Sequence, residues 1–165
     1  MSASTIGKPA GGIAAVILTP AGNILRVSGA AGEEAEVELR DPGRVCDFPL
    51  AEEGSSYEEA FDADAGPFRV RHTLRLAAGR EAESRTGSAE FLRAVAGGGL
   101  AALVTMRSGR RLLVGWSHRF GAEQPLRPVA LLAASGSRPL DKASAVLTLA
   151  SEDAGAAVEI KTQTP

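Results

Sequence analysis

The sequence predicts a mainly β fold, either an antiparallel β-barrel or a sandwich, with one short helix packed against it. Short strand-like segments lie close together along the chain and greatly outnumber helical ones, which is typical of antiparallel architectures. The 19 glycines and nine prolines are scattered and not periodic, so we expect many short elements joined by turns. Residues 67–76 alternate between apolar and polar positions, as a strand with one buried face does.

The first predicted strand, at 12–19, is an Ala/Val/Ile-rich run that ends at Pro20. A turn at 19–23 follows, and it predicts that 24–27 returns beside the first strand as its partner. The remaining predicted strands lie at 35–40, 57–64, 67–76, 100–106, 110–116, 126–134, 143–150 and 158–160.

One segment, at 88–96, is expected to be helical. Phe91, Leu92 and Val95 share one face of that helix, and a run of three glycines ends it. A helix of about two turns is marginal in water by itself, so it must pack against the sheet.

A chain of 165 residues is long enough for one domain with a real core. We expect a single β-rich domain at 11–161, with a flexible arm at 1–10 and a short tail at 162–165. The N-terminus lacks the apolar stretch of a secretory signal, and no apolar run is long enough to span a bilayer. A soluble protein made in the cytoplasm, without a membrane partner, is therefore the expectation.

The polar face of the strand at 67–76 carries Arg69, Arg71 and Arg75, and this strand contributes no carboxylate to it. Such a face suits contact with an acidic surface, including that of a neighbouring subunit. The alternative is a solvated face whose charges discourage edge aggregation.

Three further residues are candidates for subunit contact. Arg110 and Arg111 form an adjacent basic pair, and Trp116 is the single tryptophan. Tryptophan is enriched among binding hot spots, but core packing explains it equally well. We therefore predict subunit contacts through either set of basic residues or through the tryptophan.

Charge is unevenly distributed along the chain. Residues 1–66 hold 4 basic and 12 acidic side chains, whereas residues 67–165 hold 14 basic and 8 acidic ones. The two halves either cancel within one molecule or meet between subunits, which would build rings or stacks. A nucleic-acid partner is not expected, because the basic half lacks a lysine-rich run and interleaved aromatic residues.

No constellation in the sequence carries a recognisable chemistry. His72 lies in the apolar register of its strand, which favours a hydrogen-bonded core histidine. Ser117, His118 and Asp141 would form a catalytic triad only if folding brought them together, and no GxSxG motif is present. Two histidines so far apart do not have metal-ligand spacing.

Other weak signals also have simpler explanations. Asp62 and Asp64 resemble the start of a calcium loop, but its later ligands are missing. Cys46 is the only cysteine, which excludes an intrachain disulfide. We therefore expect no catalytic residues, no cofactor and no metal.

Four pieces of the sequence, taken in order, carry a resemblance to a group of proteins. They are residues 56–59, 68–74, 108–117 and 123–127, the last followed by 135–136 and 139–141. The pattern resembles prophage-encoded virion structural proteins of gut bacteria. The arrangement of antiparallel strands with one helix also resembles the tail-tube family of phages and type VI secretion systems.

The resemblance implies a β-barrel with one packed helix that forms hexameric rings. It further implies assembly in the host cytoplasm, a final location in the virion tail, and contacts with itself and other virion proteins. The expected function is that of a non-enzymatic, self-assembling tail or neck component, acting as tube, terminator or adaptor. The alternatives are a small-ligand-binding β-barrel and a hydrolase built around Ser117 and His118.

Overall fold

A computed structural model describes residues 12–29, 34–48, 50–51, 54–62, 69–78, 98–134, 144–153 and 155–161. The predicted arm, helix and tail lie outside the described residues. The elements are β1 (Ile13–Pro20), the 3-10 turn η2 (Ala21–Asn23), β2 (Ile24–Ser28), β3 (Glu36–Leu39), β4 (Cys46–Phe48), β5 (Ser56–Asp62), β6 (Arg69–Ala78), β7 (Leu100–Met106), β8 (Arg111–Val114), β9 (Arg127–Ala134), β10 (Ser144–Asp153) and β11 (Val158–Glu159).

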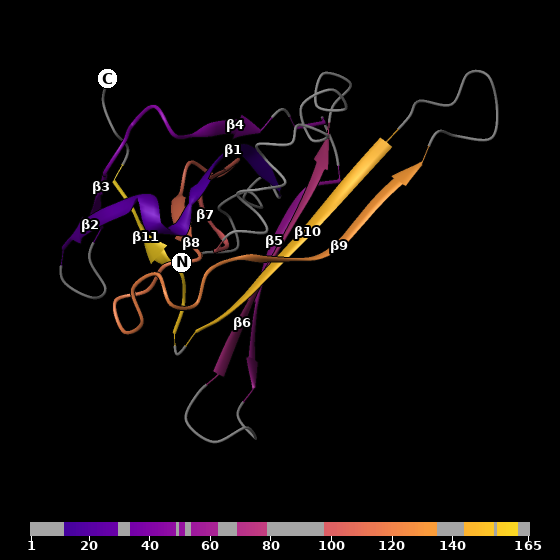
Figure 1. The fold of residues 1–165 in the computed structure, drawn as a ribbon. Helices are drawn as coiled ribbons and strands as arrows, with labels where there is room; N and C mark the ends of the chain where they lie inside the picture. Colours follow the sequence, from indigo (N-terminus) through magenta and orange to yellow (C-terminus); the bar gives the residue numbers. More distant parts are fainter. Residues whose placement is uncertain are drawn as a thin grey trace, which may run out of the picture.

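These strands form three sheets, and every pairing between named strands is antiparallel. The strand orders are β11-β8-β7-β1-β4, β5-β6-β10-β9 and β2-β3. The two larger sheets lie in separate layers (Figure 1). The predicted mainly β, antiparallel fold is thus confirmed. The described sheets keep free edges and do not close into a barrel, so the sandwich form of the prediction holds.

The main core lies between the two larger sheets. Leucine and valine side chains of β1, β7 and β8 meet those of β6 and β10, and nearly all are fully buried. The members are Ile13, Val16, Leu18, Phe48, Leu74, Leu76, Leu100, Ala102, Val104, Leu112, Val114, Leu126, Leu147 and Leu149. Burial of this apolar surface is the main force that holds the two sheets together.

A second, smaller core lies on the opposite face of the five-stranded sheet. Ala101 of β7 and Leu113 of β8 point away from the main core, and both are fully buried. They pack with Ile24 of β2 and Val158 of β11, and Trp116 packs against this cluster. The small β2-β3 sheet therefore covers the β7-β8-β11 part of the central sheet.

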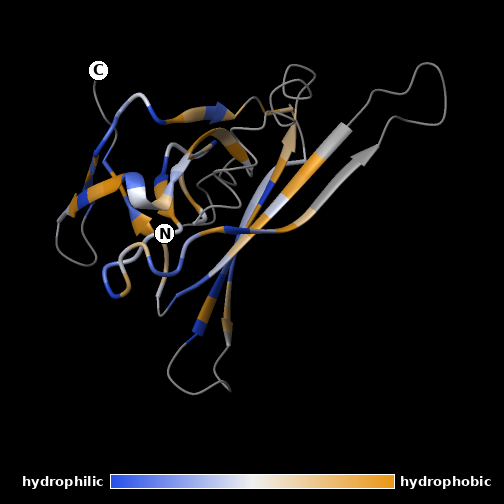
Figure 2. Cartoon of the chain, in the orientation of Figure 1, coloured by the Kyte–Doolittle hydropathy of each residue, from blue (hydrophilic) through white to orange (hydrophobic). Residues whose placement is uncertain are grey.

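The alternation expected in β6 is confirmed. Val70, His72 and Leu74 are buried, whereas Arg71 and Arg75 are exposed. Blue and orange segments alternate along this strand in the hydropathy colouring (Figure 2). The outer face of β6 therefore belongs to the solvent-exposed face of the four-stranded sheet.

The predicted hairpin between the first strand and 24–27 is wrong. β1 pairs with β4 and β7, whereas β2 pairs with β3. The turn η2 lies between β1 and β2: the Ala21 amide donates to the Gly99 carbonyl oxygen at 3.1 Å, and Asn23 is buried.

Asn23 holds this redirection in place. Its amide nitrogen donates to Thr19 Oγ1 and to the Asp41 carbonyl oxygen, each at 2.9 Å. Its side-chain oxygen accepts the Asp41 amide at 2.9 Å. A turn-forming asparagine thus joins two distant turns instead of closing a local hairpin, so β2 moves to the second core.

Candidate functional site

The arginine stripe lies on the open face of the four-stranded sheet. Arg69, Arg71 and Arg75 are all exposed. The Arg69 guanidinium lies 3.5 Å from a carboxylate oxygen of Glu152, which belongs to neighbouring β10. β10 also places Glu152 directly beside Arg71 in the register. The neighbouring strand therefore supplies one carboxylate, that of Glu152, to a face on which β6 itself has none.

Arg75 has a different setting within the same stripe. Its neighbours in the register are Ser56 of β5 and Thr148 of β10, neither of which is charged. Among the described residues, the stripe therefore has a partly neutralised end, at Arg69 and Arg71, and an end at Arg75 whose directly paired neighbours are uncharged.

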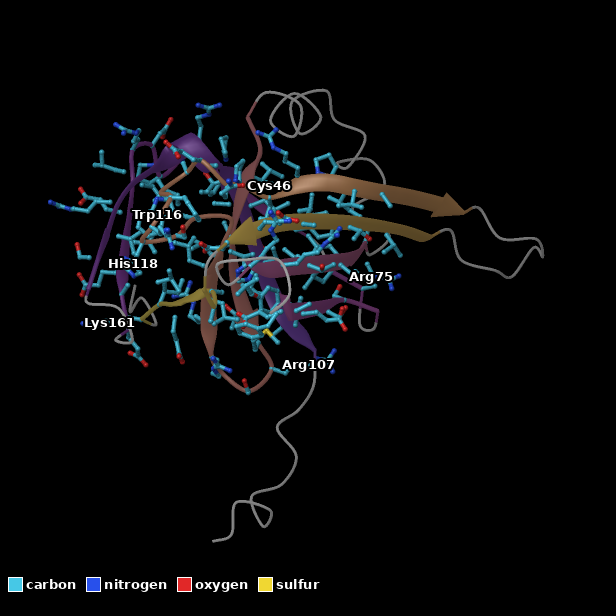
Figure 3. The ribbon with its side chains drawn as sticks, turned by 90° about the horizontal axis from the view of Figure 1, so that it is seen from below. Cys46, Arg75, Arg107, Trp116, His118 and Lys161 are labelled. Atoms are coloured by element: carbon cyan, nitrogen blue, oxygen red, sulfur yellow. The ribbon has the colours of Figure 1, made fainter. Side chains whose placement is uncertain are left out.

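The other predicted contact residues belong to a different part of the molecule. The Arg110 guanidinium lies 3.4 Å from Glu159 Oε1, and Arg111 donates to the Lys161 carbonyl oxygen at 3.1 Å. Trp116 is half-buried against the second core. Arg75 and Trp116 lie on opposite sides of the molecule (Figure 3). The six predicted residues do not form one surface.

A feature that the sequence analysis missed is the pair of free edges of the four-stranded sheet. β5 and β9 form these edges. Phe61 of β5 is 65% exposed and Val129 of β9 is 56% exposed, the two highest values among the large apolar residues described. Within the part of the chain that the structure describes, no further strand pairs with β5 or β9, so each edge presents an apolar side chain beside backbone groups of an edge strand.

β9 is irregular at Val129, and its residues 127–130 are all exposed. Thr148 pairs with Ala130 and Leu149 pairs with Pro128, so Val129 is an extra residue between them. Such a bulge turns a side chain out of the regular alternation. Proline is tolerated at sheet edges because it cannot donate to a ladder. Pro128 was therefore the available sequence signal for an edge strand.

A buried polar cluster lies at one end of the space between the two larger sheets. Tyr57 and Glu59 are two residues apart on β5 and share its inner face, and the register places His72 of β6 beside Glu59. The Tyr57 hydroxyl lies 2.5 Å from His72 Nδ1 and 2.8 Å from Glu59 Oε1. The side chain of His72 is 3% exposed and that of Glu59 is 24% exposed.

This cluster binds the segment between β10 and β11. His72 Nε2 lies 3.0 Å from the Gly155 carbonyl oxygen, and the Ala157 amide donates to Glu59 Oε1 at 3.0 Å. The expectation of a hydrogen-bonded core histidine is thus confirmed. The cluster therefore attaches the connecting segment to β5 and β6 through Glu59 and His72, and Tyr57 links these two side chains.

Burial raises the pKa of the Tyr57 hydroxyl far above its ordinary value, and the hydrogen bond and negative charge of Glu59 add to the effect. The phenol therefore stays protonated at every physiological pH. Its role in the cluster is that of a hydrogen-bond bridge between an imidazole and a carboxyl group, not that of a base.

Ser117 and His118 lie in the loop after β8. The buried Ser117 hydroxyl oxygen accepts the Phe120 amide at 2.9 Å, and Ser117 forms a bridge with Gly121. The His118 ring packs edge-on against Trp116 with centroids 5.4 Å apart. Among the described residues no hydrogen bond joins Ser117 to His118, and Asp141 lies outside them. Ser117 thus stabilises the turn at 117–121 through its hydroxyl oxygen and its backbone.

Within the described ranges, no group of three or more His, Cys, Asp and Glu residues is arranged to hold a metal ion. In the same ranges, no helix combines the length and the apolar character that crossing a membrane requires. No protein-family model, curated protein or solved structure matches the chain.

Proposed function

We propose that this chain is a non-enzymatic structural protein that assembles with copies of itself into rings or stacks, as a tail or neck component of a phage or prophage virion. One observation carries the self-assembly. The two edge strands of a single sheet, β5 and β9, each expose a large apolar side chain, Phe61 and Val129.

Two such edges suit a head-to-tail contact. An edge strand presents unpaired amide and carbonyl groups, which a strand of another chain can satisfy. If β5 of one copy docks on β9 of the next, each copy retains one free edge of each kind. Repetition of this contact gives a closed ring when the rotations between successive copies add up to a full turn, and a filament when they do not.

Charge favours this combination of edges over pairing of like edges. The edge strand β5 carries exposed Glu58, and the other edge strand begins with exposed Arg127. Opposite charges across a contact suppress wrong partners and set the register. A contact between two β5 edges would instead bring carboxylates together.

The virion context rests on the sequence resemblance. The motifs at 56–59 and 68–74 fall on β5 and β6, and the motif at 123–127 leads into β9. The resembling pieces therefore include the proposed assembly sheet. The resemblance implies a hexameric ring that acts as tube, terminator or adaptor beside other virion proteins.

Size-exclusion chromatography with light scattering, combined with negative-stain electron microscopy, tests the proposal. We expect multimers at high protein concentration and low salt, and weaker assembly as ionic strength passes about 0.15 M, where the screening length is about 8 Å and the attraction between Glu58 and Arg127 is largely screened. Val129→Asp should raise the concentration for half-assembly at least about tenfold, because it places an unpaired charge in a contact that excludes water.

Leu25→Asp is the matched control. Leu25 is also an exposed apolar residue, 44% accessible, but it lies on β2 in the small sheet. This variant should assemble like the wild type. A wild-type protein that stays monomeric at high concentration and low salt would reject self-assembly, and equal effects of the two variants would reject the β5-β9 contact.

A further inference from the structure

The small β2-β3 sheet is tied to the rest of the molecule at its two ends. In the described part of the chain, neither strand pairs with a strand of the larger sheets. One end lies where β2 begins and β3 ends, and there the Arg40 amide donates to the Asn23 carbonyl oxygen at 2.8 Å. The Asn23 side chain also bonds to Thr19 of β1 and to Asp41. This end of the small sheet is therefore tied to the end of β1.

The opposite end is held by the C-terminal segment. Ala35, just before β3, forms a parallel bridge with Ile160. The Ala35 amide donates to the Glu159 carbonyl oxygen at 2.9 Å, and the Lys161 amide donates to the Ala35 carbonyl oxygen at 2.8 Å. The C-terminal segment therefore binds the end of the small sheet that lies away from Asn23.

The same segment is anchored to both larger sheets. Val158 pairs with Leu113 of β8, and the Ile160 amide donates to the Arg111 carbonyl oxygen at 2.9 Å. The connection back to β10 is bound by the buried cluster on β5 and β6. One stretch of chain, 155–161, thus contacts all three sheets.

Between its two ends, the small sheet is held on the second core by side-chain packing. Ile24 is buried, but Val27, Val37 and Leu39 of the same inner face are only half-buried. The side chains between the two larger sheets are nearly all fully buried. The packing under the small sheet should therefore break at a lower cost than the packing of the main core.

We propose that β2-β3 is a lid, hinged beside the end of β1, and that residues 155–161 are the strap that holds it closed at Ala35. When the contact between lid and strap breaks, the lid opens while the main core stays intact. Opening uncovers Ala101 and Leu113, whose side chains are fully buried when the lid is closed. The fold can thus cover or present an apolar surface on β7 and β8.

An open lid should also lose its own strand pairing. A two-stranded sheet is at best marginally stable in water when it has no layer to pack against. The amides of β2 and β3 should therefore exchange with solvent in one event. The amides of Ala35 and Lys161 should exchange in the same event, because their hydrogen bonds join the lid to the strap.

Hydrogen exchange of the full-length protein, followed by nuclear magnetic resonance in dilute solution, measures this opening. We expect the paired amides of β2 and β3 to share one protection factor with those of Ala35 and Lys161. That factor should lie at least about tenfold below the protection of the paired amides of β6 and β10. Equal protection in the two regions, or unrelated protection of the lid and strap amides, would overturn the inference.

Ile160→Val and Leu149→Val test which packing controls the opening. Each change shortens a buried aliphatic side chain by one carbon, the first in the strap and the second in the main core. Ile160→Val should lower the protection of the lid amides about two- to tenfold. Leu149→Val should lower the protection of the β6 and β10 amides and leave that of the lid unchanged, because the main core stays intact when the lid opens.

Both variants keep an aliphatic side chain of similar volume, so we expect both to fold. Lid amides that respond equally to the two variants would show that they exchange through global unfolding, which would overturn the lid. Lid protection that is unchanged in Ile160→Val would overturn the role of the strap. The measurement does not involve assembly, so its outcome is independent of the proposed function.

Discussion

The central five-stranded sheet and the four-stranded sheet differ in how many of their faces are covered. β7 and β8 have the main core on one face and the second core on the other, so Ala101 and Leu113 are as buried as Val104. β6 has a core on one face only, and Arg75 on its other face is exposed. Coverage on both faces leaves no position for a charge, whereas an open face and free edges remain available for contact with another copy.

The largest effect is expected from Gly115→Ala, just after β8. Gly115 has φ +92°, and an added Cβ would lie 2.5 Å from the Leu100 carbonyl oxygen. Backbone strain and overpacking together should lower the free energy of unfolding by about 2–6 kcal/mol. Urea unfolding measures the change.

Gly109→Ala is the control for Gly115→Ala. Gly109 has φ +93° but an added Cβ would meet nothing within 4 Å. Only the cost of the left-handed conformation, about 1–2 kcal/mol, should remain. Equal losses in the two variants would show that the close approach between β7 and the chain after β8 adds nothing to the destabilisation by Gly115→Ala.

A second prediction compares the covered face of the five-stranded sheet with the open face of the four-stranded sheet. Leu113→Ala removes a fully buried side chain from the second core, and we expect a loss of about 2–5 kcal/mol in the free energy of unfolding. Arg75→Ala changes an exposed residue on the corresponding open face and should stay within about 0.5 kcal/mol. A tolerated Leu113→Ala would mean that the β2-β3 sheet does not cover this face in solution.

The smallest effect concerns the ion pair on the open face. Glu152→Gln removes the partner that lies 3.5 Å from Arg69. Both side chains are about half exposed, so the loss should be at most about 1 kcal/mol and should shrink with added salt. A larger, salt-independent loss in thermal unfolding would show that this face is less hydrated than the open sheet implies.

Local patterns in the sequence determined the strand content and the faces of β6. The alternation of Val70, Arg71, His72 and Leu74 is a consequence of strand geometry alone, so it could be predicted without knowing any partner.

The partners of each strand were decided by the tertiary structure. The turn at 19–23 fits a hairpin, but the hydrogen bonds of Asn23 with Asp41 redirect the chain. The short strand β4 was not predicted, because three residues are too few for a periodic signal. The second core also depends on long-range packing, which an apolar run such as that of β7 cannot specify.

The buried cluster of Tyr57, Glu59 and His72 also combines a feature that the local sequence predicts with contacts that only the tertiary structure determines. The apolar register of His72 predicts burial, and the sequence contains no carboxylate near it. Glu59 reaches it only because β5 pairs with β6, and the acceptor at Gly155 comes from 83 residues further along the chain. Period and turn chemistry are local properties of a chain, whereas hydrogen-bond partners and sheet edges depend on which distant segments meet.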